Sequence, residues 1–123
     1  MADHEKEAVL LLEDQALIAL YMEELLQQAG FPFVNICSSC SAAASWLEAH
    51  TPELAVIETR LRDGSSDSIA VALAARGIPY IIHSGDSDQK GDHPLMESKC
   101  RWITKPCNPD DFLDAVRECC PVL

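Results

Sequence analysis

Short apolar runs alternate with helical segments along the chain, and this alternation restricts the possible fold more than any other feature. Five runs have the composition of buried strands, at 7–14, 33–37, 53–58, 79–84 and 101–104. Each is followed by a segment with helical character, at 15–31, 41–50, 66–77, 86–98 and 108–120. Five consecutive strand-helix units predict an α/β domain, doubly wound, with a five-stranded parallel sheet covered by helices on both faces.

The helical segments carry recognisable ends. Gly30 and Gly77 follow the first and third segments, and Asn108 and Pro109 open the last one as N-cap and first helical residue. A serine or aspartate caps the third segment, and the segment 86–98 is expected to be short or mobile because it has little periodicity. In the first segment the apolar residues recur at helical spacing. They are Leu17, Leu20, Tyr21, Leu25 and Leu26, and in the second segment Trp46 and Leu47 are expected to face inward.

Composition narrows the class of protein. With 123 residues and 48% hydrophobic content, we expect a single domain over 1–123 and no output domain. The formal net charge of −11 disfavours binding to nucleic acid or to an anionic membrane. No apolar run approaches the ~20 residues of a spanning helix, and the start is acidic where a signal peptide is basic, so we expect a cytoplasmic protein.

Six cysteines raise an alternative from another class. Cys37 and Cys40 form a Cys-x-x-Cys pair between a predicted strand and a predicted helix, which is the setting of thiol-disulfide redox proteins. A zinc site is less well supported, because a second pair of ligands at suitable spacing is missing. We expect reduced, incidental cysteines and keep the redox protein as the rival interpretation.

Polar residues stand where four of the strands end. Glu13 and Asp14 follow the first strand, Glu58 the third and Ser84 the fourth, and Lys105 follows the fifth. Because ligand sites of such sheets lie beyond the carboxyl ends of the strands, we expect these groups to converge. Clustered carboxylates favour a hard cation such as Mg²⁺ or Mn²⁺, and a lysine and a hydroxyl would complete a cradle for a phosphoryl group.

Four short motifs now coincide with these strand ends: "ED" after "VLLL", "AVIE" before "LRDG", "HSG" after "PYII" and "TKP" after "RWI". Over nearly its full length the chain resembles a stand-alone response-regulator receiver domain of two-component phosphorelays. The resemblance implies a flavodoxin-like (βα)5 fold with strand order 2-1-3-4-5. It also implies cytoplasmic signalling through contacts with a histidine kinase, a phosphotransfer protein or another signalling protein, without enzymatic activity of its own.

The resemblance assigns roles residue by residue. Glu13 and Asp14 match the metal-binding acidic pair, Glu58 stands at the phospho-acceptor position, and Arg60 would offer its backbone carbonyl to a weakly bound Mg²⁺. Ser84 and Lys105 would contact the phosphoryl oxygens. Trp102 falls at the aromatic switch position. The expected contact surface, including any homodimer contact, is the face of the segment 86–98, the fifth strand and the last helix.

Glu58 departs from the receiver pattern, in which this position holds aspartate. Glutamate is longer by one methylene, about 1.5 Å, which is too much for the alignment that phosphoryl transfer requires. We therefore expect a modified acceptor site in which the carboxylate reaches toward Ser84 and Lys105 and partly imitates a phosphoryl group. A conventional receiver that accepts phosphate at Glu58 remains the alternative within the same fold.

Three other residues have simpler interpretations. Trp46 is expected to be core packing, and His83 a packing or hydrogen-bonding residue. Asp63 lies in the turn after the third strand, so we expect it to point away from the cradle rather than replace Glu58 as acceptor.

Overall fold

A computed structural model of the chain describes residues 8–84, 100–105 and 108–119. Within these ranges a parallel five-stranded sheet has the order β2-β1-β3-β6-β7. This confirms the predicted order 2-1-3-4-5, since β6 and β7 are the fourth and fifth strands of that sheet. The bounds are β1 (Ala8–Leu12), β2 (Phe33–Cys37), β3 (Leu54–Ile57), β6 (Tyr80–Ser84) and β7 (Cys100–Thr104).

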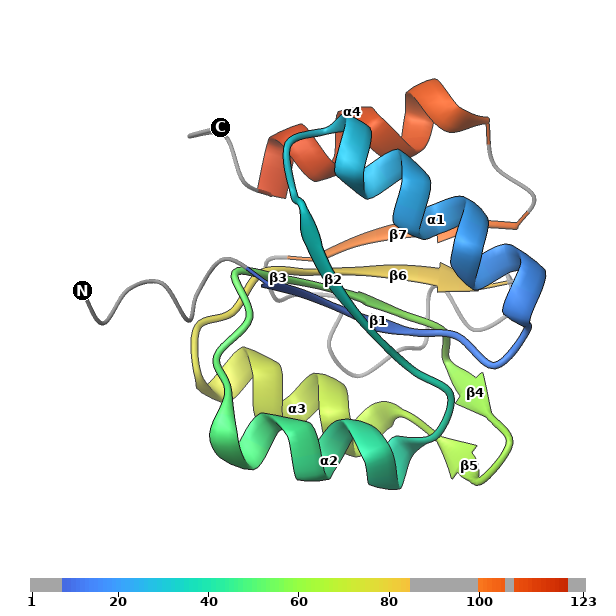
Figure 1. The fold of residues 1–123 in the computed structure, drawn as a ribbon. Coiled ribbons are helices and arrows are strands. Elements are labelled where there is room, and N and C mark those ends of the chain that lie inside the picture. The colour runs from blue at the N-terminus through green and yellow to red at the C-terminus, as the bar shows by residue number, and fades with distance from the viewer. Residues whose placement is uncertain (1–7, 85–99, 106–107, 120–123) are drawn as a thin grey trace.

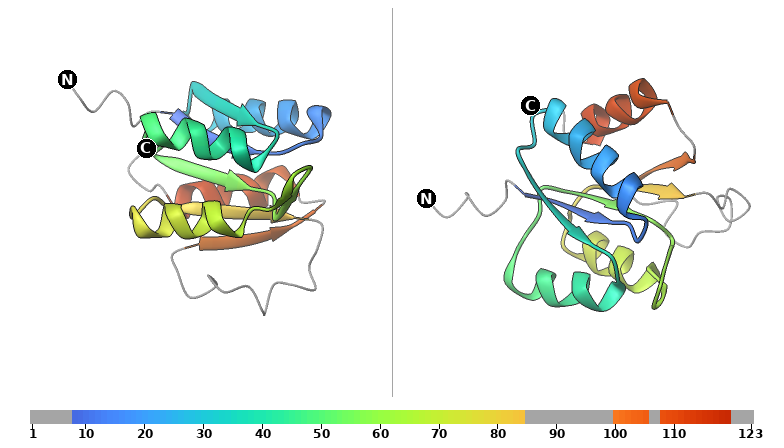
Figure 2. Two further views of the ribbon diagram at one scale, coloured as in Figure 1. Left: turned by 90° about the horizontal axis from the view of Figure 1, so that it is seen from below. Right: turned by 45° about the vertical axis from the view of Figure 1, so that its right-hand side comes forward.

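The helices cover both faces of the sheet, as predicted. Figure 1 shows α1 (Ala16–Gln28) and α4 (Pro109–Cys119) on one face, and α2 (Cys40–Ala49) and α3 (Asp67–Ala75) on the other. The two views of Figure 2 show the same three layers from other sides. The predicted helix at 86–98 lies outside the described residues. None of the helices in the described ranges has the length and hydrophobicity of a membrane-spanning segment.

The core has two halves, one on each side of the sheet, because successive strand residues point to opposite faces. Leu11 of β1 packs with the buried residues of α1 and α4, whereas Leu10 and Leu12 pack with those of α2 and α3. The central strands β1 and β3 are buried on both faces, so they are apolar throughout rather than alternating. Each fully buried aliphatic side chain contributes roughly 1.5–3 kcal/mol to folding.

Glycines end two of the helices, as the sequence predicts. Gly30 follows α1 and Gly77 follows α3, and both have positive φ, at 106° and 72°. After α3, the backbone N–H of Ile78 donates to the Leu73 carbonyl at 3.0 Å and that of Gly77 to the Ala74 carbonyl at 3.1 Å. This is a Schellman ending, and Ile78 and Leu73 are both buried beside it.

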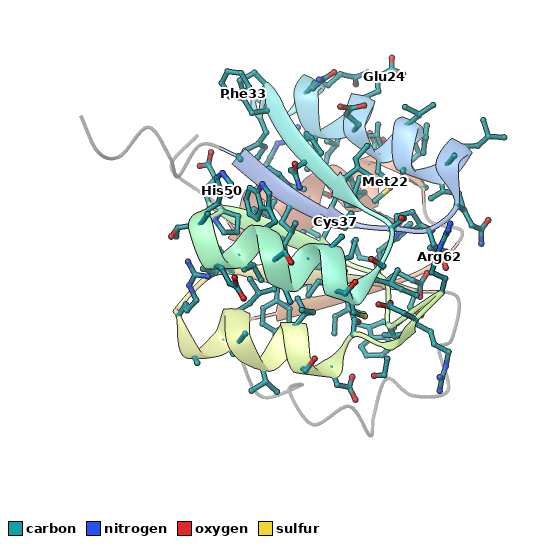
Figure 3. The ribbon with its side chains drawn as sticks, turned by 60° about the horizontal axis from the view of Figure 1, so that its bottom comes forward. Met22, Glu24, Phe33, Cys37, His50 and Arg62 are labelled. Carbon is teal, nitrogen blue, oxygen red and sulfur yellow. The ribbon has the colours of Figure 1, made fainter. Side chains whose placement is uncertain are left out.

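The first helix buries only two of its five recurring apolar residues, Leu25 and Leu26. Leu17 is 82% exposed, Leu20 57% and Tyr21 46%, although all three recur at helical spacing. The buried residues are Ala19, Met22, Leu25 and Leu26. Figure 3 shows Met22 on the sheet side of α1 and Glu24 on the outer side. The helix begins with apolar residues on nearly every side, so periodicity alone did not identify the face that contacts the sheet.

A small hairpin between β3 and α3 was not predicted. Its strands β4 (Arg60–Leu61) and β5 (Gly64–Ser65) pair antiparallel. Asp63 joins this hairpin to the start of α2, because its carboxylate accepts from the backbone N–H of Cys40 at 2.8 Å and from that of Ser41 at 3.1 Å. The Asp63 carboxylate is therefore engaged by the start of α2, in line with the expectation that it points away from the cradle.

Candidate functional site

The carboxyl edge of the sheet brings together four of the predicted site residues. Glu13, Glu58, Ser84 and Lys105 come directly from the ends of β1, β3, β6 and β7, which are neighbours in the sheet. The backbone N–H of Lys105 donates to the Ser84 carbonyl at 2.8 Å, which continues the pairing of β6 with β7. The sheet order thus places two carboxylates, one hydroxyl and one ammonium at one edge.

Lys105 joins the two carboxylates. Its Nζ lies 2.8 Å from Glu13 Oε1 and 2.5 Å from Glu58 Oε1. The side chains are largely withdrawn from water, at 14% exposure for Lys105, 2% for Glu13 and 12% for Glu58. Burial lowers the pKa of Lys105, but the hydrogen bonds and charges of the two glutamates outweigh it and raise that pKa overall. The lysine is therefore firmly protonated and held between two anions.

Glu58 is ionised as well. Burial raises the pKa of its carboxyl, but hydrogen bonds from Lys105, Ser84 and the Thr59 backbone N–H, together with the Lys105 charge, bring that pKa below its ordinary value. The site therefore contains a fixed negative charge at the position that the resemblance assigns to the phospho-acceptor.

Two further residues of the site were missed by the sequence reasoning. Thr59 is 6% exposed, and its hydroxyl lies 3.3 Å from Glu58 Oε2 and 2.8 Å from Ser84 Oγ. Ser66, at the start of α3, donates its hydroxyl to the Glu58 carbonyl at 2.7 Å. The available signal was a second polar residue immediately after Glu58. Ser66 stands at the N-cap of α3, in line with the expected serine or aspartate, but its side chain makes no capping hydrogen bond and holds Glu58 instead.

Other predicted residues are not part of this contact network as described. Asp14 is half-buried, and Arg60 is exposed as the first residue of β4. Trp102 is 7% exposed and packs in the core half that faces α2 and α3. The segment 86–98, which the predicted contact surface includes, is outside the described residues.

The donor chemistry at this edge suits a hard cation, but the described arrangement does not form a metal site. Glu13 and Glu58 each direct one oxygen at Lys105. Across the described ranges, no group of three or more Asp, Glu, His or Cys side chains is placed to hold a metal ion. The predicted set of Glu13, Asp14, Glu58 and the Arg60 carbonyl therefore stays a prediction.

The two cysteines of the Cys-x-x-Cys pair do not have the properties of redox catalysts. Burial raises the pKa of Cys37, and burial together with the nearby Asp63 charge raises the pKa of Cys40 to about 11. Cys40 lies at the start of α2, where its thiol donates to the Ser65 carbonyl at 3.4 Å. Because the thiolate is the reactive form, raised pKa values disfavour catalysis by either cysteine.

His83 belongs to the core beside the site. It is 5% exposed, and its ring lies 6.2 Å from that of Phe112. Burial, followed by the Lys105 charge, lowers its pKa to about 4, so it is neutral at pH 7. This agrees with the predicted packing role.

Comparisons with known proteins identify the relatives of this fold. No family model matches the chain. The transcriptional regulatory protein PdtaR of Mycobacterium tuberculosis is 24% identical over 111 residues, which cover 88% of this chain and 54% of PdtaR. The chain thus spans about half the length of this curated relative.

Solved structures resemble the chain over nearly its whole length. SdrG from Sphingomonas melonis Fr1 is 29% identical with a TM-score of 0.75, covering 89% of this chain and 92% of SdrG. The PhyR response regulator REC domain of Erythrobacter litoralis is 22% identical with a TM-score of 0.80, covering 94% and 90%.

A third structure, the receiver domain of the sensor histidine kinase PA1611 from Pseudomonas aeruginosa PAO1, contains magnesium coordinated in its active site cleft. It is 17% identical with a TM-score of 0.77, covering 91% of this chain and 95% of that domain. Together with the flavodoxin-like strand order, these likenesses show that the chain has the CheY-like fold of response regulator receiver domains.

Proposed function

We propose that this chain is a receiver module of a phosphorelay whose acceptor site carries a built-in negative charge, and that it acts through protein contacts rather than as an enzyme. The observation that carries the proposal is the ion pair of Glu58 with Lys105, at 2.5 Å. In a receiver this lysine would pair with a phosphoryl oxygen. Here the carboxylate of Glu58 forms the ion pair with Lys105 instead.

The consequence is a module that signals with little or no phosphorylation. One carboxylate provides a single charge, whereas a phosphoryl group provides about −1.5 to −2, so Glu58 imitates the phosphorylated state only in part. Partners would be a histidine kinase, a phosphotransfer protein or another signalling protein. Binding of Mg²⁺ would be weak, because the cation competes with Lys105 for Glu13 and Glu58.

The test is to shorten residue 58. Wild type incubated with acetyl phosphate and Mg²⁺ should gain no phosphoryl group, whereas Glu58→Asp should gain one as the carboxylate attacks phosphorus and acetate leaves. Intact-protein mass spectrometry measures the added mass. The gain should disappear when Asp14 or Lys105 is also replaced, because charge that develops during transfer is then no longer stabilised.

A matched control is available at the other end of the same strand. Glu53 directly precedes β3, and Glu53→Asp makes the same shortening far from the cradle, so it should leave the protein unphosphorylated. Phosphorylation of wild type at Glu58 would instead establish the conventional receiver. An inert Glu58→Asp protein that still binds Mg²⁺ would show that the chain is a binding module on a receiver scaffold.

A further inference from the structure

Thr59 contacts both Glu58 and Ser84. Its backbone N–H donates to Glu58 Oε2 at 2.9 Å, and its hydroxyl lies 3.3 Å from the same oxygen and 2.8 Å from Ser84 Oγ. The hydroxyl pair is buried, because Thr59 is 6% exposed and Ser84 is 1% exposed. Thr59 thus stands between the end of β3 and the end of β6.

The backbone around Thr59 is held in place from α3. The backbone N–H of Ser66 donates to the Thr59 carbonyl at 3.0 Å, and the Ser66 hydroxyl donates to the Glu58 carbonyl at 2.7 Å. Threonine is also β-branched, which restricts its side-chain rotation. Both restraints place the Thr59 hydroxyl at a defined position beside Ser84.

The number of hydroxyl protons limits which group can donate in each of these contacts. Thr59 and Ser84 each have one hydroxyl proton, and the hydrogen bond between them uses only one of the two. The other proton is then available to the Glu58 carboxylate, which accepts but does not donate while it is ionised. The orientation of one hydroxyl therefore depends on the other and on the charge of residue 58.

We infer that Thr59 is a positioning residue that couples the state of residue 58 to the orientation of the Ser84 hydroxyl. The inference rests on the proposed function, in which Ser84 is expected to respond to the state of the acceptor site. Ser84 also hydrogen-bonds to the Glu58 carboxylate directly, so Thr59 would act by holding the Ser84 hydroxyl in the orientation that makes this bond. The β3 and β6 ends would then respond as one unit.

The experiment is a double-mutant comparison by NMR on the full chain. Glu58→Gln removes the charge at nearly constant size, and the resulting change in the Ser84 β-carbon shift and side-chain couplings is the measured effect. We expect that effect to be lost in a Thr59→Val background and to return with Thr59→Ser, which restores the hydroxyl. A merely structural role for Thr59 predicts no such rescue by a hydroxyl.

Control variants separate coupling from general disturbance. Thr51→Val removes a threonine hydroxyl that accepts from Arg76 at 2.7 Å, away from the strand ends, and it should leave the effect intact. Thr59→Ala repeats the test if Thr59→Val unfolds. Persistence of the full Ser84 response in either folded variant that lacks the hydroxyl would overturn the inference, because the direct Ser84–Glu58 hydrogen bond would then carry the response without Thr59.

This NMR measurement needs neither a metal nor a phosphoryl donor, so the inference and the proposed function can be rejected separately. Suppose that the Ser84 response is lost in Thr59→Val and that Glu58→Asp takes up no phosphoryl group. These results would support the inference and reject position 58 as a phospho-acceptor position. The reverse pair of results rejects the inference and keeps the acceptor role.

Discussion

At the strand ends, burial and nearby charges together set the protonation state of single residues, which their positions in the sequence only partly indicated. Glu58 is an anion that remains ionised despite burial, because Lys105 and the hydroxyl and amide donors around it outweigh desolvation. His83 shows the opposite balance, since burial and the same lysine disfavour its charged form. Lys105 thus lowers the pKa of both neighbours, although burial is the larger cause at His83.

His83 should make the stability of the protein depend on pH. As the pH falls below 6.5 the unfolded chain takes up a proton at this histidine, whereas the folded chain does so only near pH 4. The unfolded state then binds more protons, so the free energy of unfolding should fall across this window by up to about 3 kcal/mol. Denaturant unfolding at a series of pH values measures the slope.

Substitution identifies the source of that slope. His83→Gln should flatten it, whereas His50→Gln, at an exposed position stacked on Trp46, should preserve it. An unchanged slope in His83→Gln would mean that other groups carry the acid dependence.

At the scale of elements, helix ends and helix faces follow different rules. The start of α2 is saturated by side chains, since Ser39 Oγ accepts from the Ala42 N–H at 3.1 Å and Asp63 accepts from the Cys40 and Ser41 N–H groups. Such ends depend on nearby residues or on one hairpin. The buried face of α1 depends instead on the whole sheet beneath it.

The observed face of α1 predicts an unequal response to leucine substitutions. Leu17→Gln and Leu20→Gln should each change the free energy of unfolding by less than about 0.5 kcal/mol, because both side chains are exposed. Leu26→Ala should cost about 2–5 kcal/mol, because Leu26 is fully buried. Urea denaturation distinguishes the cases, and equal losses at all three leucines would contradict the helix orientation.

At the scale of the whole molecule, the charge network joins distant parts of the chain. Lys105 and Glu13 are 92 residues apart in sequence yet lie within hydrogen-bond distance. The parallel sheet makes this possible, because all its strands end at the same edge. Lys105 consequently connects the first and the last strand of the fold.

Removing Lys105 should therefore destabilise the domain as a whole. Lys105→Met leaves Glu13 and Glu58 without their shared cation in a largely buried place, and the free energy of unfolding should fall by about 3–5 kcal/mol. Arg117→Met breaks the ion pair with Asp114, where both side chains are 64% exposed, and serves as the control. That change should cost less than about 1 kcal/mol. Equal, small losses in thermal or urea unfolding would show that the buried network contributes little.

The sequence by itself determined the five strands of the sheet, the helices α1 to α4, the helix-ending glycines, the parallel arrangement and most residues at its carboxyl edge. These features depend on hydrophobic periodicity and on turn residues, which act over a few neighbouring positions. The family resemblance added the strand order and the roles that are expected of Glu58, Ser84 and Lys105. It also suggested a metal set that the described contacts do not assemble.

Only the tertiary structure decided which side chains meet. The sheet selected the Met22 side of α1 over the Leu17 side, directed Trp102 toward α2 and α3, and brought the Thr59 hydroxyl to Ser84. Such contacts join residues far apart in sequence, and they depend on the packing of all three layers at once. Local pattern carries no information about them, because a residue's neighbours in space are chosen by the complete fold.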